Sequence, residues 1–154
     1  MCTMIERIIV GAGCFWGVEA AFGALAGIVQ TQAGYAGGWT EQPSYEDVCA
    51  GSTGHAEVVE LHVDLTIISL NELLGYFWAM LEPPADPDPQ YRAMIICSNA
   101  AQLELALASK LAQPQLVDYS VEIKLDLPFY PAEEYHQQCY RKWRDRFERR
   151  AKVV

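Results

Sequence analysis

A cysteine between glycines and aromatic residues is the first candidate for chemistry. Cys14 stands in the run Gly13-Cys14-Phe15-Trp16-Gly17, between an apolar segment and a helical pattern. At the start of a helix, backbone N–H groups and the helix dipole favour a thiolate, so we expect the pKa of this thiol to fall below about 8.5. The glycines let the backbone turn sharply and a ligand come close, and the aromatics can wall an apolar pocket. A buried structural cysteine at a strand-to-helix corner is the alternative.

Glu57 is the second candidate. In the predicted strand it shares a face with Val59, Leu61 and Val63. A carboxylate on a core-facing row is costly unless it is paired, hydrogen-bonded or protonated, and burial raises its pKa enough to make it a proton donor. A solvent-facing residue at the strand edge is the alternative that composition alone favours. Nearby His55 is, as a lone loop histidine, more often a hydrogen-bonding residue than a catalyst.

Tyrosines and cysteines complete the reactive inventory. A phenol donates a hydrogen bond to a substrate oxygen without being charged, although half-buried packing is the commoner role for any one tyrosine. The loop tyrosines are Tyr35, Tyr45, Tyr91, Tyr130 and Tyr135, and the five cysteines are Cys2, Cys14, Cys49, Cys97 and Cys139. No Cys-x-x-Cys pair occurs, so the sequence predicts neither a structural zinc site nor any other metal site.

Length and composition indicate one folded domain over residues 1–154. The chain is 51% hydrophobic and 20% charged, which suffices for a core. Its net charge of −9 argues against nucleic-acid binding. No apolar run is long enough for a membrane span and the N-terminus lacks the pattern of a secretory signal, so we expect a cytosolic protein with reduced thiols.

The charge is uneven along the chain. From Arg141 onward seven basic residues face two acidic ones, a net charge of +5, which leaves −14 on the preceding residues. We expect this basic tail to dock on its own acidic body.

Hydrophobic periodicity and caps define the elements that must position these residues. Helices are expected around Val18–Leu25, from Ser69 to about Met80, from Asn99 to about Ala112, and from Pro131 toward Arg150. Strands are expected at 6–10, 28–33, 57–64, 92–97 and 121–125, with an ordered loop at 34–54 and an irregular loop at 82–89. This order predicts an α+β fold, a ferredoxin-like sandwich of a mixed or antiparallel sheet with extra helices.

From about Ile8 to Tyr140 the chain resembles the methionine sulfoxide reductases of the A class. The resemblance rests on ordered motifs: Gly13-Cys14-Phe15-Trp16-Gly17-Val18-Glu19, Gly34-Tyr35-Ala36-Gly37-Gly38, Pro43-Ser44-Tyr45-Glu46-Asp47-Val48-Cys49, Gly51-Ser52-Thr53-Gly54-His55-Ala56-Glu57, Gln90-Tyr91-Arg92, and Phe129-Tyr130-Pro131-Ala132-Glu133-Glu134-Tyr135-His136-Gln137-Gln138. Each motif alone is weak, and their order is highly specific. It implies a reductase-like core at about 6–140. The end of this core overlaps the basic C-terminal helix, which is expected at about 132–150.

The resemblance also implies roles. Cys14 matches the nucleophile that attacks the sulfoxide sulfur, and Glu57 matches the acid that protonates the sulfoxide oxygen. The other matching positions are Phe15 and Trp16 for the methyl group, with Gly13 and His55 beside them at the substrate, and Tyr45, Tyr91 and Asp86 around the oxygen. The product is methionine and a Cys14 sulfenic acid, which a second thiol reduces.

Three departures from the family pattern matter. Ala93 replaces the usual serine after Tyr91-Arg92. The loop before Gln90 is shortened and proline-rich, so that only Asp86 keeps its offset from Tyr91, and Asp88 is the alternative. The chain also lacks a glycine-rich tail with recycling cysteines. Cys139 and, as a weaker alternative, Cys49 could resolve the sulfenic acid, but we expect an external thiol to do so.

The sequence thus predicts a cytosolic peptide-methionine (S)-S-oxide reductase that acts on protein-bound and free methionine sulfoxide. No cofactor is implied, and thioredoxin, glutaredoxin or a small thiol would supply electrons. The alternative is a non-catalytic module of the same fold that binds methionine-containing peptides.

Overall fold

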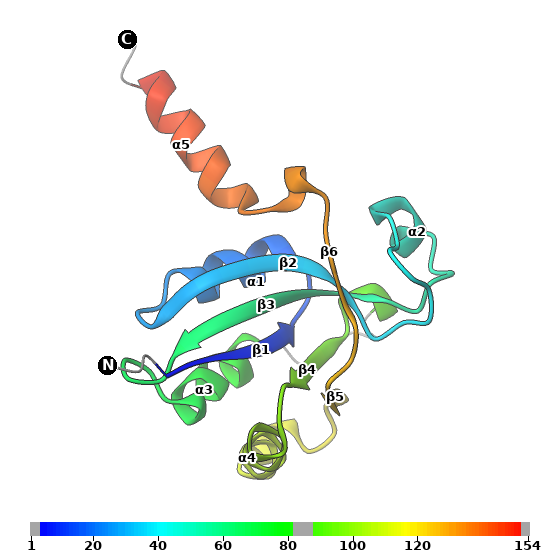
Figure 1. Ribbon diagram of the computed structural model, residues 1–154, viewed down its shortest axis with the longest axis vertical. Coiled ribbons are helices and arrows are strands. Elements are labelled where there is room, and N and C mark those ends of the chain that lie inside the picture. Colours follow the sequence, from blue (N-terminus) through cyan, green and yellow to red (C-terminus); the bar gives the residue numbers. More distant parts are fainter. Residues whose placement is uncertain (1–3, 82–87, 152–154) are drawn as a thin grey trace.

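A six-stranded curled sheet forms the centre of the computed structural model, which describes residues 4–81 and 88–151 (Figure 1). The strands lie in the order β5 (Val121–Leu125), β4 (Ala93–Cys97), β1 (Ile5–Gly11), β3 (Ala56–Asp64), β2 (Ile28–Ala36) and β6 (Phe129–Pro131). All neighbours are antiparallel except β4 and β5. The inner order β4-β1-β3-β2 is that of a ferredoxin-like sandwich, so the predicted fold class is confirmed.

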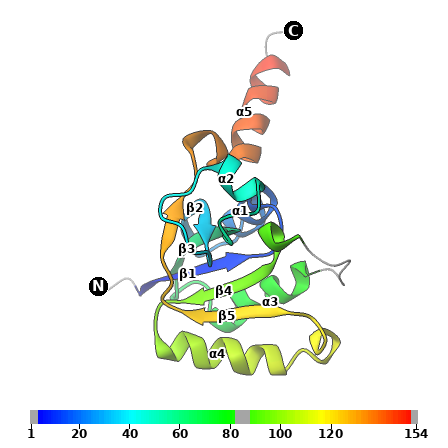
Figure 2. The same cartoon turned by 90° about the vertical axis from the view of Figure 1, so that its right-hand side faces the viewer.

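Three helices cover one face of the sheet. α1 (Phe15–Gly23), α3 (Leu70–Met80) and α4 (Ala100–Leu111) share one apolar core with inward-facing residues of β1, β3 and β4. Figure 2 shows α4 beside β5, at the end of the molecule opposite to α5. A smaller cluster on the other face is covered by Leu127 and Phe129. Glu57 is buried and belongs to the helix-covered face together with Val59, Leu61 and Val63, as the alternation of its strand predicts.

Local sequence signals set most of the element boundaries. The Ser69 and Asn99 side chains accept hydrogen bonds from the Glu72 and Gln102 backbone N–H groups, which caps α3 and α4 as predicted. The expected loop at 34–54 contains one short helix, α2 (Tyr45–Cys49), with a capping box. Within residues 4–81 and 88–151, no helix is both long enough and apolar enough to cross a membrane.

The prediction of a helix from Pro131 is wrong. Residues 129–131 form β6 along β2, where the ring of Phe129 occupies the space a side chain at Gly34 would need. A 3₁₀ turn at Glu134–His136 follows, and α5 begins only at Cys139 and ends at Ala151. Pro131 suits the first turn of a helix, but pairing with a strand far away in the sequence outweighs that local preference.

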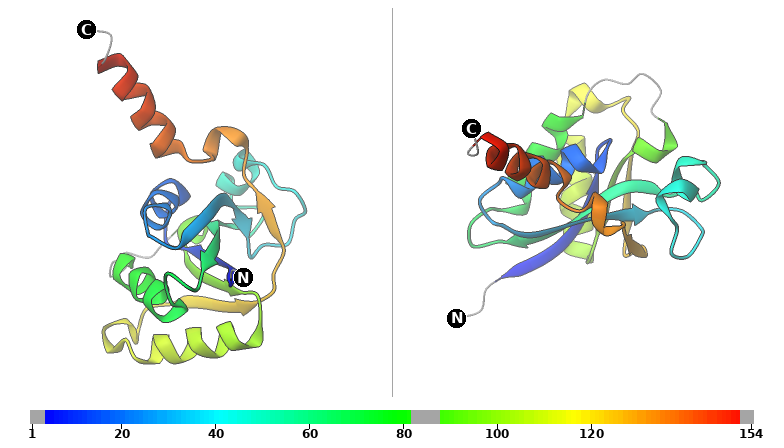
Figure 3. Two further views of the ribbon diagram at one scale, coloured as in Figure 1. Left: turned by 60° about the vertical axis from the view of Figure 1, so that its left-hand side comes forward. Right: turned by 90° about the horizontal axis from the view of Figure 1, so that it is seen from above.

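The prediction that the basic tail docks on the acidic body is also wrong. α5 stands away from the sheet, and only its beginning packs beside α1 (Figures 1 and 3). Among the described side chains of α5, Lys142 alone forms an ion pair with the body, at 3.4 Å from Glu134. Exposed charges separated by more than about 8–10 Å are screened by salt, so an excess of opposite charge does not by itself fold the helix back.

Candidate active site

The Cys14 thiol lies where β1 ends and α1 begins. Gly13 has φ +98°, a conformation that favours glycine, and Cys14 is the residue that precedes the first helical turn. The backbone N–H groups of Trp16 and Gly17 lower the pKa of the thiol, but desolvation by the surrounding protein is the larger effect and raises it. The prediction of a lowered pKa for Cys14 is therefore wrong. Desolvation of the thiol raises its pKa more than the backbone N–H groups at the helix start lower it.

Glu57 faces this thiol from the neighbouring strand β3. It is only 1% exposed, so the solvent-facing alternative is excluded. Its Oε1 accepts the Phe15 backbone N–H at 3.1 Å, and its Oε2 accepts the Gln90 side-chain amide at 2.6 Å. Burial raises the pKa of this carboxyl, and the two hydrogen bonds offset part of that rise. The result is a buried carboxyl poised to hold a proton.

Glu57 and Cys14 are electrostatically coupled. The negative charge of ionised Glu57 raises the pKa of the Cys14 thiol. A protonated Glu57 removes that repulsion, so loss of the Cys14 proton is easier when the carboxyl holds its own.

Two tyrosines come close to these groups. Burial and the charges of Glu57 and Cys14 raise the pKa of Tyr91, and a hydrogen bond between the Tyr45 hydroxyl and Cys49 raises the pKa of Tyr45. Both phenols are therefore neutral hydrogen-bond donors at physiological pH. Tyr91 belongs to the same short turn as Gln90, which begins at the Pro-rich loop.

An aromatic wall surrounds His136, which is 2% exposed. Its ring centroid lies 4.5 Å from that of Tyr45, 5.2 Å from Phe15 and 5.6 Å from Trp16. The Trp16 indole N–H donates to His136 Nδ1 at 3.0 Å, which needs an unprotonated nitrogen there. Burial lowers the pKa of His136 and keeps the ring neutral. Trp16 is thus the partly exposed apolar side chain beside the thiol, and the buried Phe15 ring packs behind it against His136.

Glu133 ties this wall to the sheet. Its carboxylate accepts the Tyr35 hydroxyl at 2.9 Å and the Tyr45 backbone N–H at 3.0 Å, and lies 3.7 Å from His136 Nε2. Sequence reasoning assigned no role to Gln90, Glu133 or His136. The only available signal was their place inside the family motifs.

The structure separates the remaining candidates. His55 uses both ring nitrogens within its own loop: Nδ1 accepts the Gly38 N–H at 3.0 Å and Nε2 lies 2.7 Å from the Thr40 carbonyl. It braces the loop, and any hydrogen bond to a substrate would have to replace one of these. Asp86 lies outside the described residues. Asp88 caps the turn that carries Tyr91 and raises the Tyr91 pKa.

Cys49 and Cys139 have different partners. The Gln90 amide that binds Glu57 also lies 3.4 Å from the Cys49 sulfur, so Cys49 belongs to the hydrogen-bond network of the site. The Cys139 thiol donates to the Tyr135 carbonyl at the start of α5. Both are free thiols, and in the described parts of the chain no cluster of three or more His, Cys, Asp or Glu side chains could hold a metal.

Comparisons with known proteins agree on one family. A sequence profile described as "Peptide methionine sulfoxide reductase" matches residues 6–153. A Vibrio parahaemolyticus relative, "Peptide methionine sulfoxide reductase MsrA", is 42% identical over 149 residues, which are 89% of this chain and 70% of the relative. The structure of methionine sulfoxide reductase A of Corynebacterium diphtheriae aligns with a TM-score of 0.82 at 32% identity, over 90% of this chain and 74% of that one. Saccharomyces cerevisiae Mxr1 in complex with Trx2 aligns with a TM-score of 0.59 at 27% identity, over 86% of this chain and 84% of that one.

The fold and these relatives place the chain in a class of oxidoreductases. The chain belongs to the peptide methionine sulfoxide reductase family.

Proposed function

We propose that the chain reduces the S epimer of methionine sulfoxide, in proteins and free, through a Cys14 sulfenic acid. The observation that carries this proposal is the pair formed by the Cys14 thiol and the buried Glu57 carboxyl, whose raised pKa keeps a proton available. A sulfoxide sulfur accepts a nucleophile only as its oxygen gains a proton, and this pair supplies both.

The reaction balances without a cofactor. The Cys14 thiolate attacks the sulfoxide sulfur while Glu57 protonates the oxygen, which forms a bond between the two sulfurs. The S–O bond of the substrate then breaks and the oxygen ends as a hydroxyl group on Cys14. The sulfur–sulfur bond breaks in the same exchange and leaves its electron pair on the methionine sulfur. The sulfoxide is reduced by two electrons to the thioether, and the thiol is oxidised to a sulfenic acid. A second thiol then attacks Cys14, which forms a disulfide and releases water.

The residues around this pair suit the substrate. The Trp16 side chain, held by His136 and backed by buried Phe15, supports binding of the S-methyl group, with Gly13 leaving open space nearby. The neutral hydroxyls of Tyr45 and Tyr91 are donors for the sulfoxide oxygen, where negative charge develops before the proton arrives.

The electrons come from a thiol reductant. The solved complex of Mxr1 with Trx2 supports a thioredoxin, and glutaredoxin or a small thiol can do the same chemistry. We place this reaction in the cytosol, where thiols are kept reduced.

A single-turnover assay tests the proposal. Fully reduced protein, mixed with excess N-acetyl-methionine (S)-sulfoxide and no added thiol, should form one methionine per chain, and the R epimer should form none. If methionine-containing peptides bind but neither epimer is reduced, the chain is the non-catalytic peptide-binding module instead.

A further inference from the structure

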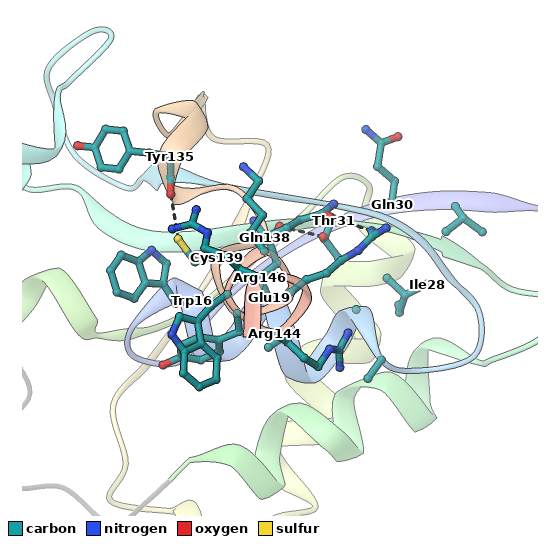
Figure 4. Close-up of a pocket in the computed structure, with 18 residues that line it drawn as sticks. Trp16, Glu19, Ile28, Gln30, Thr31, Tyr135, Gln138, Cys139, Arg144 and Arg146 are labelled. Atoms are coloured by element: carbon teal, nitrogen blue, oxygen red, sulfur yellow. Dashed lines mark hydrogen bonds between the residues drawn. The ribbon is translucent and has the colours of Figure 1, made fainter. Parts of the chain in front are cut away.

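A groove of about 990 Å³ runs beside the candidate active site, between α1, the start of β2 and the first half of α5 (Figure 4). Its floor on α1 is made of the small residues Ala20, Gly23 and Ala24. Because α5 stands away from the body, this groove is open along its length. Its size and flat floor suit an extended polypeptide.

The charge of the groove is opposite to that of the chain. Its lining holds one acidic side chain and four basic ones, namely Arg141, Lys142, Arg144 and Arg146, whereas the whole chain has a net charge of −9. The acidic residue, Glu19, is buried and already accepts hydrogen bonds from the Gln138 backbone N–H at 2.6 Å and the Thr31 hydroxyl at 2.8 Å. The four basic side chains are exposed, and Figure 4 shows Arg144 and Arg146 beside the groove. Lys142 already pairs with Glu134, and Arg141 donates to the Gln138 side chain.

The groove is continuous with the candidate active site through Trp16. Trp16 lines the groove, follows Cys14 by two positions, and is held by His136 on the side of the site. Tyr135, which stacks on His136 at 4.1 Å, lines the groove as well. A polypeptide whose methionine side chain reaches Cys14 therefore has this groove beside it as its main chain leaves the site.

We propose that the groove binds the acidic residues flanking the oxidised methionine of a protein substrate, and so selects acidic polypeptides. This inference rests on the proposed function and names the substrate class. The basic lining of the groove repels positively charged polypeptides. Glu19 is the one acidic residue that lines the groove, so the other carboxylates of the chain do not cancel this effect there. The attraction acts on association and is screened by salt.

The size of the effect follows from the exposed ion pairs. Each such pair is worth a factor of about two. Because Lys142 already pairs with Glu134, the three arginines should give a factor of about eight, which is on the order of a tenfold preference. The first test compares three peptides with one central methionine (S)-sulfoxide, flanked by aspartate, serine or lysine. We expect kcat/KM to fall about tenfold from the aspartate to the lysine peptide at low salt, and the difference to disappear at high salt.

Matched variants locate the preference. Arg144→Glu with Arg146→Glu should abolish or reverse the order of the peptides, while N-acetyl-methionine sulfoxide is reduced as fast as by the parent protein. Arg149→Glu changes the charge of the same helix outside the groove lining and should leave most of the preference in place. Circular dichroism shows whether α5 persists in each variant.

The outcomes separate the inference from the proposed function. Equal kcat/KM for all three peptides, with normal reduction of the small substrate, overturns the acidic-substrate inference alone. A preference that Arg149→Glu removes as fully as the double variant also overturns it. If sedimentation shows a dimer that the double variant dissociates, the groove serves a second copy and the inference is wrong. If no substrate is reduced, the proposed function itself is wrong.

Discussion

The candidate active site and helix α5 are built in opposite ways. In the site, each polar group is fixed by partners on other elements: Glu57 by Phe15 and Gln90, and Glu133 by Tyr35 and Tyr45. In α5, the basic side chains lie along an exposed helix. Substitutions in the site should therefore have large effects that depend on one another, and substitutions in the helix should have small effects that add.

The largest effect is expected for Cys14→Ser. A hydroxyl is far less nucleophilic than a thiolate and forms no sulfenic acid, so methionine formation should stop. A single-turnover assay measures this, and a fluorescence or calorimetric binding titration checks that methionine sulfoxide still binds. Substantial reduction by the variant would mean that another group is the nucleophile.

Glu57→Gln should slow the chemical step about 10²–10⁴-fold and change substrate binding much less. The amide donates a hydrogen bond but cannot deliver a proton. The same variant should lower the pKa of Cys14, because a neutral amide no longer repels the thiolate. The rate of alkylation against pH measures that pKa. Single-turnover rates within a few-fold of the parent protein would rule Glu57 out as the acid.

Gln90→Met should raise the pKa of Glu57 further. The Gln90 amide stabilises the ionised carboxylate, as hydrogen bonds to charged groups do by about 1.5–3 kcal/mol, and its loss favours the protonated form. A ¹³C titration of the carboxyl, assigned by comparison with Glu57→Gln, reports the shift. An unchanged pKa would show that burial alone sets the proton affinity.

The smallest effects are expected for the two thiols that could resolve the sulfenic acid. Cys49→Ser is an exception to the large effects expected in the site, because it keeps a hydrogen-bonding group beside Gln90, and Cys139→Ser lies at the root of α5. Each should leave turnover with dithiothreitol unchanged, because an external thiol resolves the sulfenic acid. One turnover without reductant should remove a single free thiol and leave Cys14 reactive toward dimedone. Loss of two thiols, with a Cys14–Cys139 or Cys14–Cys49 linkage in the peptide map, would contradict this.

The sequence predicted what depends on local patterns and on the family motifs. Apolar alternation placed Glu57 on the buried face of β3, and the Ser69 and Asn99 caps placed the starts of α3 and α4. It misplaced the last helix because the pairing of β6 with β2 depends on residues far away in the sequence.

The site was predicted less completely than the fold. The roles of Gln90, Glu133 and His136 escaped prediction, since which polar group a glutamine or glutamate binds is decided by tertiary packing. The predicted direction of the Cys14 pKa shift was wrong for the same reason, because desolvation of the thiol depends on the complete fold.

The pairing of β6 with β2 means that the site is completed late during synthesis of the chain. Trp16 and His136 are 120 positions apart, and Tyr35 and Glu133 are 98 apart, so the thiol leaves the ribosome long before its wall exists. Until β6 pairs with β2, His136 does not yet bind Trp16 beside Cys14, and Glu133 does not yet bind the backbone of Tyr45. A nascent or truncated chain ending before Phe129 thus lacks the residues that hold Trp16 and Tyr45 beside the thiol, and we expect no reductase chemistry until the last quarter of the polypeptide has packed on the first.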